Sequence, residues 1–503
     1  MSRPDPSRIP ADRLEIRVDR PARAGGEFVL YWMIAQRRLT WNFALDRAIE
    51  WAKELGKPLV VLEALRCDYR WASERLHRFV LEGMADNAQR AAGRNVLYFP
   101  YVEPERGAGK GLLRALSRRA CVIVTDDFPC FFLPRMVDAA AAQVECRLEV
   151  VDANGLLPLS TTDAAAPTAY VFRRFLQKNL PSHLEHFPSP APLGSLDLPE
   201  LEELLPKDGS RTWERAPAAL LEGEPKALRS LPIDHSVPSV SLRGGSAAAE
   251  SRLDAFLHQQ LLTYSEKRND PDDRATSGLS PYLHFGHISA HQVFSAIADA
   301  ERWAPEDVAR SATGARAGWW RMSASAEGFL DQLVTWREVG YHFCRHRPDY
   351  AEYESLPAWA LATLRRHAPD ARSPVYSLAD LEAGRTYDAL WNAAQRQLAE
   401  TGEMHNYLRM LWGKKVLEWS ESPREAVESL IHLNNKYAID GRNPNSYSGI
   451  FWCFGRFDRA WGPEREIFGT VRYMSSANTA RKLRLKSYLA RFGDRTLFEN
   501  DVS

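Results

Sequence analysis

The feature that most constrains the fold is a change in hydrophobic pattern part-way along the chain. Between residues 28 and 154, short apolar runs such as EFVLYWM and CVIVTDD alternate with helix-like segments, of which NFALDRAIEWAKELG is the clearest. Short buried strands separated by amphipathic helices predict a parallel sheet covered on both faces. After residue 251 strand-like runs almost vanish and helical periodicity dominates. The fold class predicted is an N-terminal α/β domain of Rossmann-like type followed by an all-α domain.

The predicted domains span residues 28–160 and 251–503, with a connector at 161–250. The connector is rich in proline, glycine, serine and acidic residues, which predicts at most partial order. Ligands of parallel α/β sheets bind at the carboxyl ends of strands, where the polar TDD of residues 125–127 is expected. No GxGxxG follows the first strand, so a standard dinucleotide fingerprint is missing.

Composition narrows the class of protein. The charges of the 65 basic and 65 acidic side chains cancel, which argues against a surface that is positive throughout. A local cationic patch is still possible. The six cysteines form neither a CxxC pair nor a zinc-like pairing with histidine, and no metal site is expected. The N-terminal segment lacks the apolar core of a signal peptide, and no apolar run approaches membrane-spanning length. A cytoplasmic, unexported protein without a membrane partner is expected, and a monomer.

The run TSGLSPYLHFG combines groups that can hold an anion at a helix start. Thr276, Ser277 and Ser280 supply hydroxyls. Gly278 permits a tight backbone, and Pro281 suits the first turn of a helix. The unpaired N–H groups of a helix start bind phosphate. Taken alone, an ordinary hydroxyl N-cap explains this run better.

The segment MHNYLRMLWGKKVLEW places cations and large rings on one helical face. Spacings of four, three, four and three residues separate its members, His405, Arg409, Trp412, Val416 and Trp419. Such a face suits a ligand with both charge and an aromatic system, or a cation–π surface packed between helices. Trp391, in the preceding predicted helix, could approach it. From the residues alone, the two interpretations are equally good.

The segment LNNKYAIDGRNPNSYSGIFWCFG, residues 433–455, joins four asparagines and Asp440 to several aromatic rings. Amide and carboxylate groups can bind the edge of a heterocycle by hydrogen bonds. The same residues also form Asx-turns, and in isolation this second interpretation is the better one.

The segment RYMSSANTARKLRLKSYLAR, residues 472–491, holds six basic residues and no acidic one. In a chain of balanced charge, this pattern is typical of contacts to a nucleic-acid backbone. A solvated helix face is the alternative. The neighbouring aromatic segment favours DNA or RNA.

Together these segments resemble the photolyase and cryptochrome family, most closely the class II cyclobutane pyrimidine dimer photolyases. The matching stretches are YSEKRNDPDDRATSGLSPYLHFGHIS, MHNYLRMLWGKKVLEW, LNNKYAIDGRNPNSYSG and WGPEREIFGTVRYM, and the resemblance covers nearly all of residues 28–488. It implies an antenna domain that holds a deazaflavin, a folate, a flavin or no pigment, and a helical domain that holds FAD in a U shape.

The implied activity is light-driven repair of damaged duplex DNA. Reduced FAD would donate an electron to a flipped-out dimer, the ring would split, and the electron would return. The resemblance assigns FAD contacts to Tyr264, Thr276, Ser277, Gly278, Leu279, Ser280, Arg337, Asn406, Arg409, Asp440, Gly441 and Asn445. It places Asn434 beside flavin N5, and it makes Trp412, Trp391 and Trp419 the electron route from the surface. The lesion and its DNA would be contacted by Gln332, Trp336, Met410, Trp452 and Arg472.

Two positions depart from the family pattern. Gln332 stands where dimer repairers usually carry a glutamate that hydrogen-bonds the lesion, unless an alignment from the following WRE shifts the site by one residue. Glutamine keeps the hydrogen bonds but brings no charge and no titratable proton. Thr479 stands where cysteine is expected, and nothing explains that change.

The glutamine leaves three outcomes open: weaker repair, a shift toward (6-4) photoproducts, or a cryptochrome-like photoreceptor. Only about fifteen residues follow Tyr488, whereas cryptochromes often carry a long tail, so repair is favoured. A DNA-binding helical protein with purely structural aromatic residues is a third hypothesis, which a lack of flavin absorbance would support.

Overall fold

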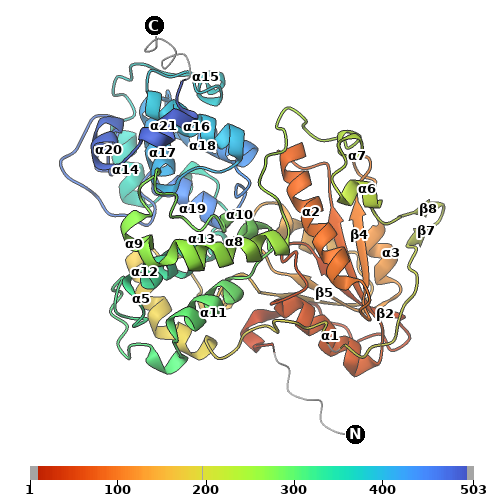
Figure 1. The fold of residues 1–503 in the computed structure, drawn as a ribbon. Helices are drawn as coiled ribbons and strands as arrows, with labels where there is room; N and C mark the ends of the chain where they lie inside the picture. Colours follow the sequence, from red (N-terminus) through yellow and green to blue (C-terminus); the bar gives the residue numbers. More distant parts are fainter. Residues whose placement is uncertain (1–8, 195, 495–503) are drawn as a thin grey trace. The chain divides into compact units, whose positions relative to one another are not determined.

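The structure is a computed structural model that describes residues 9–194 and 196–494. The chain divides into two compact units, each assembled from several segments (Figure 1). Unit 1 comprises residues 1–162, 179–254 and 278–306, and unit 2 comprises residues 163–178, 255–277 and 307–503. Most of the expected connector therefore packs within unit 1, as do residues 278–306 of the expected helical domain.

Unit 1 is built on a six-stranded sheet in the order β1-β6-β5-β2-β3-β4. Its strands are β1 (Leu14–Val18), β2 (Phe28–Met33), β3 (Leu59–Leu65), β4 (Leu97–Val102), β5 (Ala120–Asp126) and β6 (Arg147–Val151). Strands β2 to β6 pair in parallel, and β1 pairs antiparallel with β6. The α/β fold predicted from the alternating pattern is confirmed, with one antiparallel edge strand added.

The helices of unit 1 connect these strands or follow the sheet in sequence. They are α1 (Phe43–Leu55), α2 (Glu74–Ala91), α3 (Leu112–Ser117), α4 (Leu133–Ala141), α6 (Ala218–Leu221), α7 (Pro225–Arg229), α10 (Ser280–Phe285) and α11 (Ala290–Glu301). A two-stranded ribbon, β7 (Lys207–Asp208) and β8 (Arg211–Thr212), lies in the former connector, and α8 (Ser246–Gln259) carries residues of both units.

Local sequence explains why α1 forms where it does. Asn42 caps its start by accepting hydrogen bonds from the backbone N–H groups of Ala44 and Leu45. Gly56 ends it at φ 58°, a left-handed conformation that glycine adopts without strain. The helix packs in one core with Val29 and Tyr31 of β2, whose residues are all buried. Burial on both faces is typical of a central parallel strand.

Asp126 lies at the carboxyl end of β5, as predicted, but it serves the fold. Its carboxylate accepts hydrogen bonds from the backbone N–H groups of Ile34, Ala35 and Gln36 at 2.9, 2.8 and 3.0 Å. The Tyr31 hydroxyl donates to the same carboxylate at 2.7 Å. Asp126 therefore fixes the loop after β2, at the point where the strand order reverses.

Strand β1 was not predicted, because its LEIRV sequence is short and partly charged. Its residues are half-buried or exposed, as expected for an edge strand. Arg13, just before it, is 2% exposed and donates hydrogen bonds to the carbonyl oxygens of Asp152, Gly155 and Leu156. This buried arginine ties the N-terminal segment to the end of β6.

Unit 2 is helical, which confirms the second half of the predicted fold class (Figure 1). Its helices are α5 (Ala169–Asn179), α9 (Tyr264–Lys267), α12 (Ala324–Leu330), α13 (Arg337–His346), α14 (Ala358–Arg366), α15 (Leu378–Glu382), α16 (Ala389–Thr401), α17 (Asn406–Trp419), α18 (Pro423–Tyr437), α19 (Pro444–Trp452), α20 (Ser476–Lys482) and α21 (Lys486–Phe492). Helices α16 to α19 share one apolar core with parts of α14 and α21.

The predicted helix at 327–346 is interrupted in the structure. A π-helical turn, η6 (Asp331–Trp336), separates α12 from α13. Wider turns of this kind are rare and frequently mark functional sites, because they re-aim the side chains that they carry. Within the described residues, no helix is long and apolar enough to cross a membrane, and no disulfide joins the six buried cysteines.

Candidate functional site

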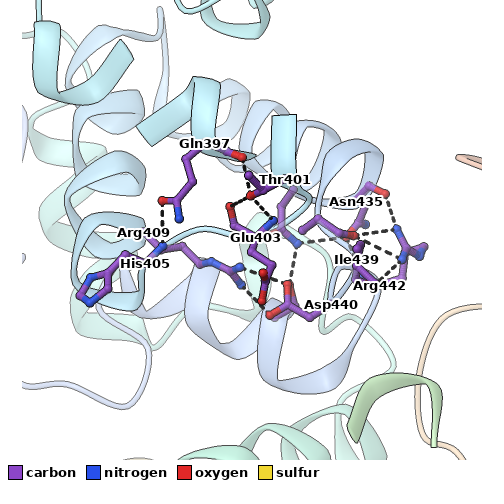
Figure 2. A network of polar contacts seen from close by, with 12 residues as sticks. Gln397, Thr401, Glu403, His405, Arg409, Asn435, Ile439, Asp440 and Arg442 are labelled. Atoms are coloured by element: carbon purple, nitrogen blue, oxygen red, sulfur yellow. Dashed lines mark hydrogen bonds and ion pairs between the residues drawn. The ribbon is translucent and has the colours of Figure 1, made fainter. Parts of the chain in front are cut away.

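Arg409 of α17 and Asp440, just after α18, form the centre of a polar site in unit 2 (Figure 2). The guanidinium donates two hydrogen bonds to the carboxylate, Nη2 to Oδ1 at 3.1 Å and Nη1 to Oδ2 at 3.3 Å. The two side chains are 24% and 12% exposed. A two-point, largely buried pair of this kind fixes the direction of both groups.

The turn between α16 and α17 sets this pair in place (Figure 2). The Thr401 hydroxyl donates to the Gln397 carbonyl oxygen at 2.8 Å, and the Gln397 side chain accepts the backbone N–H of His405 at 3.2 Å. The backbone N–H of Ile439 donates to the Gly402 carbonyl oxygen at 2.9 Å. These bonds hold the start of α17 against the end of α18, from which the two charged side chains face each other.

Asn434 and Gly441 lie beside this pair. Asn434 is 2% exposed, and its Nδ2 donates to the Ser446 hydroxyl of α19 at 2.6 Å. A Cβ at Gly441 would lie 2.7 Å from the Asn434 carbonyl oxygen, so only glycine fits there. Three predicted residues, Asn434, Asp440 and Gly441, are thus brought together, and Ser446 is a partner that sequence reasoning missed.

Arg337 and Asn445 come from the neighbouring helices α13 and α19. Arg337 lies 4.3 Å above the ring of Tyr341 and donates to its hydroxyl at 3.1 Å. Asn443 donates to the same hydroxyl at 3.2 Å and accepts the backbone N–H of Asn445 at 2.9 Å. Tyr341 was not predicted, although it stands one helical turn after Arg337.

Three tryptophans form a row inside unit 2. The rings of Trp412 and Trp391 are 6.4 Å apart between centroids and nearly parallel, and Trp391 lies 5.5 Å from Trp419. Each is at most 2% exposed. Trp412 Nε1 donates to Gln395 Oε1, and Trp391 Nε1 donates to the Trp412 carbonyl oxygen, both at 3.0 Å. The predicted approach of Trp391 to the α17 stripe is confirmed.

Gln332 and Trp336 both lie on the π-helical turn η6. They are half-buried, whereas the other four residues of the turn are buried. A π-helix has more than four residues per turn, so residues four apart point in similar directions. The turn therefore presents these two predicted side chains on its outer face. Its neighbour Asp331 is anchored inward by an ion pair with Arg173 at 2.8 Å.

The Trp452 ring lies close to two cations. Arg472 Cζ lies 5.6 Å from its ring centroid, and Lys414 Nζ of α17 lies 5.2 Å from it. Arg472 also stacks over Trp461 at 4.0 Å and pairs with Asp458 at 3.3 Å. Two predicted contacts, Trp452 and Arg472, are therefore neighbours in the structure.

Lys414 is a buried cation that the sequence did not single out. It is 0% exposed, and its Nζ donates to the Cys453 carbonyl oxygen at 2.5 Å. Burial lowers its pKa to about 8. Met410, one helical turn earlier, lies near the same cysteine, whose Sγ is 3.8 Å from the Met410 carbonyl oxygen.

The basic segment 472–491 is only partly available for an anion. Arg484 forms ion pairs with Asp270 and Asp273, and its Nε lies 3.0 Å from the Asp270 carboxylate. The other basic residues from the start of α20 onward are exposed: Arg481, Lys482, Lys486 and Arg491. A segment without acidic residues thus finds acidic partners elsewhere in the chain.

The run at 276–286 begins a helix at Ser280, as predicted, with Pro281 in its first turn. Leu279 occupies the position before this helix, and its side chain forms no capping hydrogen bond. Gly278 has φ 63°, the left-handed region that favours glycine. Thr276 and Ser277 belong to unit 2 and the rest of the run to unit 1.

Two of the predicted flavin contacts lie at other places in unit 2. Tyr264 packs edge-on against Phe256 and Phe329, at 5.7 and 5.3 Å between ring centroids, and burial raises its pKa. Asn406 is the exposed first residue of α17. Among the described contacts, neither joins the cluster around Asp440.

Comparison with known proteins agrees with this architecture. A family model described as DNA photolyase matches residues 29–192. The deoxyribodipyrimidine photo-lyase of Methanothermobacter thermautotrophicus is 34% identical over 470 residues, which cover 93% of this chain and 94% of that protein. The chain belongs to the DNA photolyase family. The prediction from the quoted motifs that the chain is a DNA photolyase, and an enzyme, is confirmed.

Other members of the photolyase family match over similar lengths. The deoxyribodipyrimidine photo-lyase of Oryza sativa subsp. japonica is 33% identical, with 94% of this chain and 89% of that protein covered. The one from Arabidopsis thaliana is 32% identical, with 92% and 88% covered. The crystal structure of a class III photolyase from Agrobacterium tumefaciens has the same fold, with a TM-score of 0.66, 18% identity, and 93% and 86% coverage.

Proposed function

We propose that this photolyase repairs cyclobutane pyrimidine dimers in DNA by light-driven electron transfer from reduced FAD, and that it is of class II. The observation that carries the proposal is the composition of α17. One helix supplies Arg409 to a buried polar cluster and Trp412 to a row of buried tryptophans. Bound FAD would supply the absorption of light and the transferred electron; the residues supply position and charge.

The polar cluster fits the ring system of a flavin. Arg409 offers positive charge for a reduced, anionic ring, and Asp440 can accept hydrogen bonds from ring N–H groups. Asn434 presents an amide whose Nδ2 is already held by Ser446, so its orientation is fixed before a ligand binds. Arg337 adds a second guanidinium, which Tyr341 orients.

The remaining predicted contacts suit the rest of the dinucleotide. We assign the phosphates and the ribityl chain to the hydroxyl and backbone N–H groups of Thr276, Ser277, Gly278, Leu279 and Ser280, and further FAD contacts to Tyr264 and Asn406. Gly441 would contact the ligand through its backbone, and Asn445 through its side-chain amide. Anions bind well to successive N–H groups in a glycine-containing turn.

The lesion would bind to the half-buried residues of unit 2. Trp336 and Trp452 offer flat surfaces for the two joined pyrimidines, Met410 offers an adaptable apolar contact, and Gln332 offers hydrogen bonds. Flipping costs least at a damaged pair, which is already poorly stacked. Arg472 would contact the flanking phosphates, together with exposed basic residues of α20 and α21.

Gln332 favours a second candidate function, repair with altered lesion preference or photoreception without repair. Its side chain is on the outer face of η6, where it can reach a substrate, and it is neutral. A neutral amide cannot transfer a proton to a lesion, as a protonated glutamate can. These candidates differ in which lesion is restored, and in whether any DNA is restored at all.

The test is repair of duplexes that carry either a single cyclobutane dimer or a single (6-4) product, by FAD-loaded and fully reduced protein, in light and in darkness. Restoration of the dimer only in light supports the proposal, and the same protein stripped of flavin is the control. Normal flavin binding and photoreduction without restoration of any lesion would favour photoreception. Protein that never binds flavin would contradict both.

We further propose that unit 1 holds an antenna pigment beside the loops that follow β3 and β5. Tyr69 packs on Phe132 at 5.6 Å, Trp71 on Phe131 at 6.2 Å, and Arg70 lies 4.5 Å above Trp71. Flat rings and a cation at the carboxyl edge of a sheet suit a flat, charged chromophore. Trp71→Ala should abolish energy transfer from an added deazaflavin or folate, and unchanged transfer would contradict this placement.

A further inference from the structure

The tryptophan row described above does not reach the surface. Trp412 and Trp391 are buried, and Trp419 is only 1% exposed. A route that brings electrons from a reductant in solution needs a last group that the solvent can reach. Within the described residues, two tyrosine rings contact Trp419 edge-on, Tyr376 at 5.4 Å and Tyr387 at 5.5 Å between centroids.

The two tyrosines differ in exposure and in role. Tyr387 is 62% exposed. Tyr376 is less accessible, because it is partly buried against the core that contains Trp419. The Tyr376 hydroxyl accepts the backbone N–H of Tyr387 at 2.9 Å, so it holds the backbone of its neighbour. Asp388, the next residue, caps α16 by accepting the backbone N–H of Trp391 at 3.0 Å. The exposed ring is thus fixed with respect to the tryptophan row.

The charges around Trp419 favour moving a positive charge outward. Lys415 Nζ lies 5.1 Å from the Trp419 ring and 5.9 Å from the Tyr387 ring. Lys415 is paired with Glu418 at 3.0 Å, and this pair raises its pKa, so it stays charged at neutral pH. A cation at this distance opposes a second positive charge on the indole. A phenol avoids that repulsion because it stays neutral when it loses an electron and a proton together.

We propose that Tyr387 is the surface end of the electron route. Oxidised Trp419, which lacks one electron, takes one electron from Tyr387. The phenol O–H bond breaks, its proton passes to solvent at the exposed edge, and a neutral phenoxyl radical is left. A thiol in solution then donates a hydrogen atom, which restores the phenol and leaves a thiyl radical. The inference rests on the proposed function, because only a bound, light-excited flavin would oxidise the tryptophan row.

The test is flash absorption spectroscopy of FAD-loaded protein, with Tyr387→Phe and Tyr376→Phe as a matched pair. Both variants keep the ring that packs on Trp419, so the fold should survive, and flavin content checks this. We expect a tyrosyl radical signal after the tryptophan signal decays in the wild type. The signal should be lost in Tyr387→Phe, with a longer-lived tryptophan radical and slower photoreduction by thiol, and retained in Tyr376→Phe.

Other outcomes overturn the inference in distinguishable ways. Normal tryptophan oxidation with no tyrosyl signal in the wild type, or a signal that persists in Tyr387→Phe, overturns this inference alone. Loss of the signal only in Tyr376→Phe would move the terminus to the partly buried Tyr376. No tryptophan oxidation in any FAD-loaded protein would overturn the electron route of the proposed function as well.

Discussion

The buried ammonium group of Lys414 should make the stability of the photolyase depend on pH in a calculable way. Burial lowers its pKa from 10.5 to about 8. Between these two values the unfolded chain binds more protons than the folded one, so stability rises with pH through this window. Below about pH 8 the free-energy cost of burying the charged ammonium group is fully present. At 1.36 kcal/mol per pKa unit, lowering the pKa from 10.5 to about 8 corresponds to a cost of about 3 kcal/mol for burying the charged form.

The perturbation is Lys414→Met, which keeps the length of the side chain but removes the titrating group. The free energy of unfolding of the wild type, minus that of the variant, should increase by about 3 kcal/mol between pH 7 and pH 10.5. For a unit of this size that corresponds to a relative shift in Tm of roughly 6–12 °C. Thermal unfolding of both FAD-loaded proteins across this pH range measures it.

Lys415→Met is the matched control. Its neighbour Glu418 raises the pKa of Lys415, so the stabilisation by this pair is fully present below pH 10.5 and is lost only above it. The difference between wild type and Lys415→Met should therefore stay level from pH 7 to pH 10. A level difference for Lys414→Met as well would refute the reasoning, because it would mean that no buried charge lies beneath Trp452.

Three further changes test the site. Asp440→Asn leaves Arg409 without its counter-charge, which costs about 3 kcal/mol of stability for a buried pair. The variant should retain less flavin per protein molecule. Full retention would mean that the pair is not part of the flavin site. Trp412→Phe should slow photoreduction by an added thiol, followed by flavin absorbance, and an unimpaired rate would exclude it from the electron route. Arg472→Ala should weaken binding of lesion DNA and reduce its salt dependence more than Arg484→Ala does, because Arg484 is paired with two aspartates and Arg472 with only one, Asp458. Equal effects would argue against a phosphate contact at Arg472.

Much of the fold follows from local sequence. The apolar run of β2 and the periodic segment of α1 predict these elements within about two residues, because burial dictates both patterns. Strand β1 could not be predicted, since an edge strand needs no apolar run. The π-helical turn η6 was missed because its sequence keeps a helical pattern on both sides.

In the site, too, neighbours on one helix could be predicted from the sequence, but contacts between distant segments could not. The α17 stripe predicts that Arg409 and Trp412 are near one another, but only the fold pairs Arg409 with Asp440. Lys414 was missed because lysine in a helix normally points to solvent, and its burial depends on the position of α19. Likewise, Arg484 was counted among available cations because nothing local reveals an ion pair with residues more than two hundred positions away.

A repair assay with two different lesions shows both whether the photolyase repairs dimers and whether Gln332 contacts the lesion. FAD-loaded, fully reduced wild-type protein and the Gln332→Glu variant are illuminated with a duplex that contains either a cyclobutane dimer or a (6-4) product. We expect light-dependent restoration of the dimer by the wild type, and a changed yield or lesion preference in the variant at equal flavin content. Unchanged repair in the variant would mean that Gln332 does not contact the lesion. Restoration of neither lesion by the wild type would contradict the account.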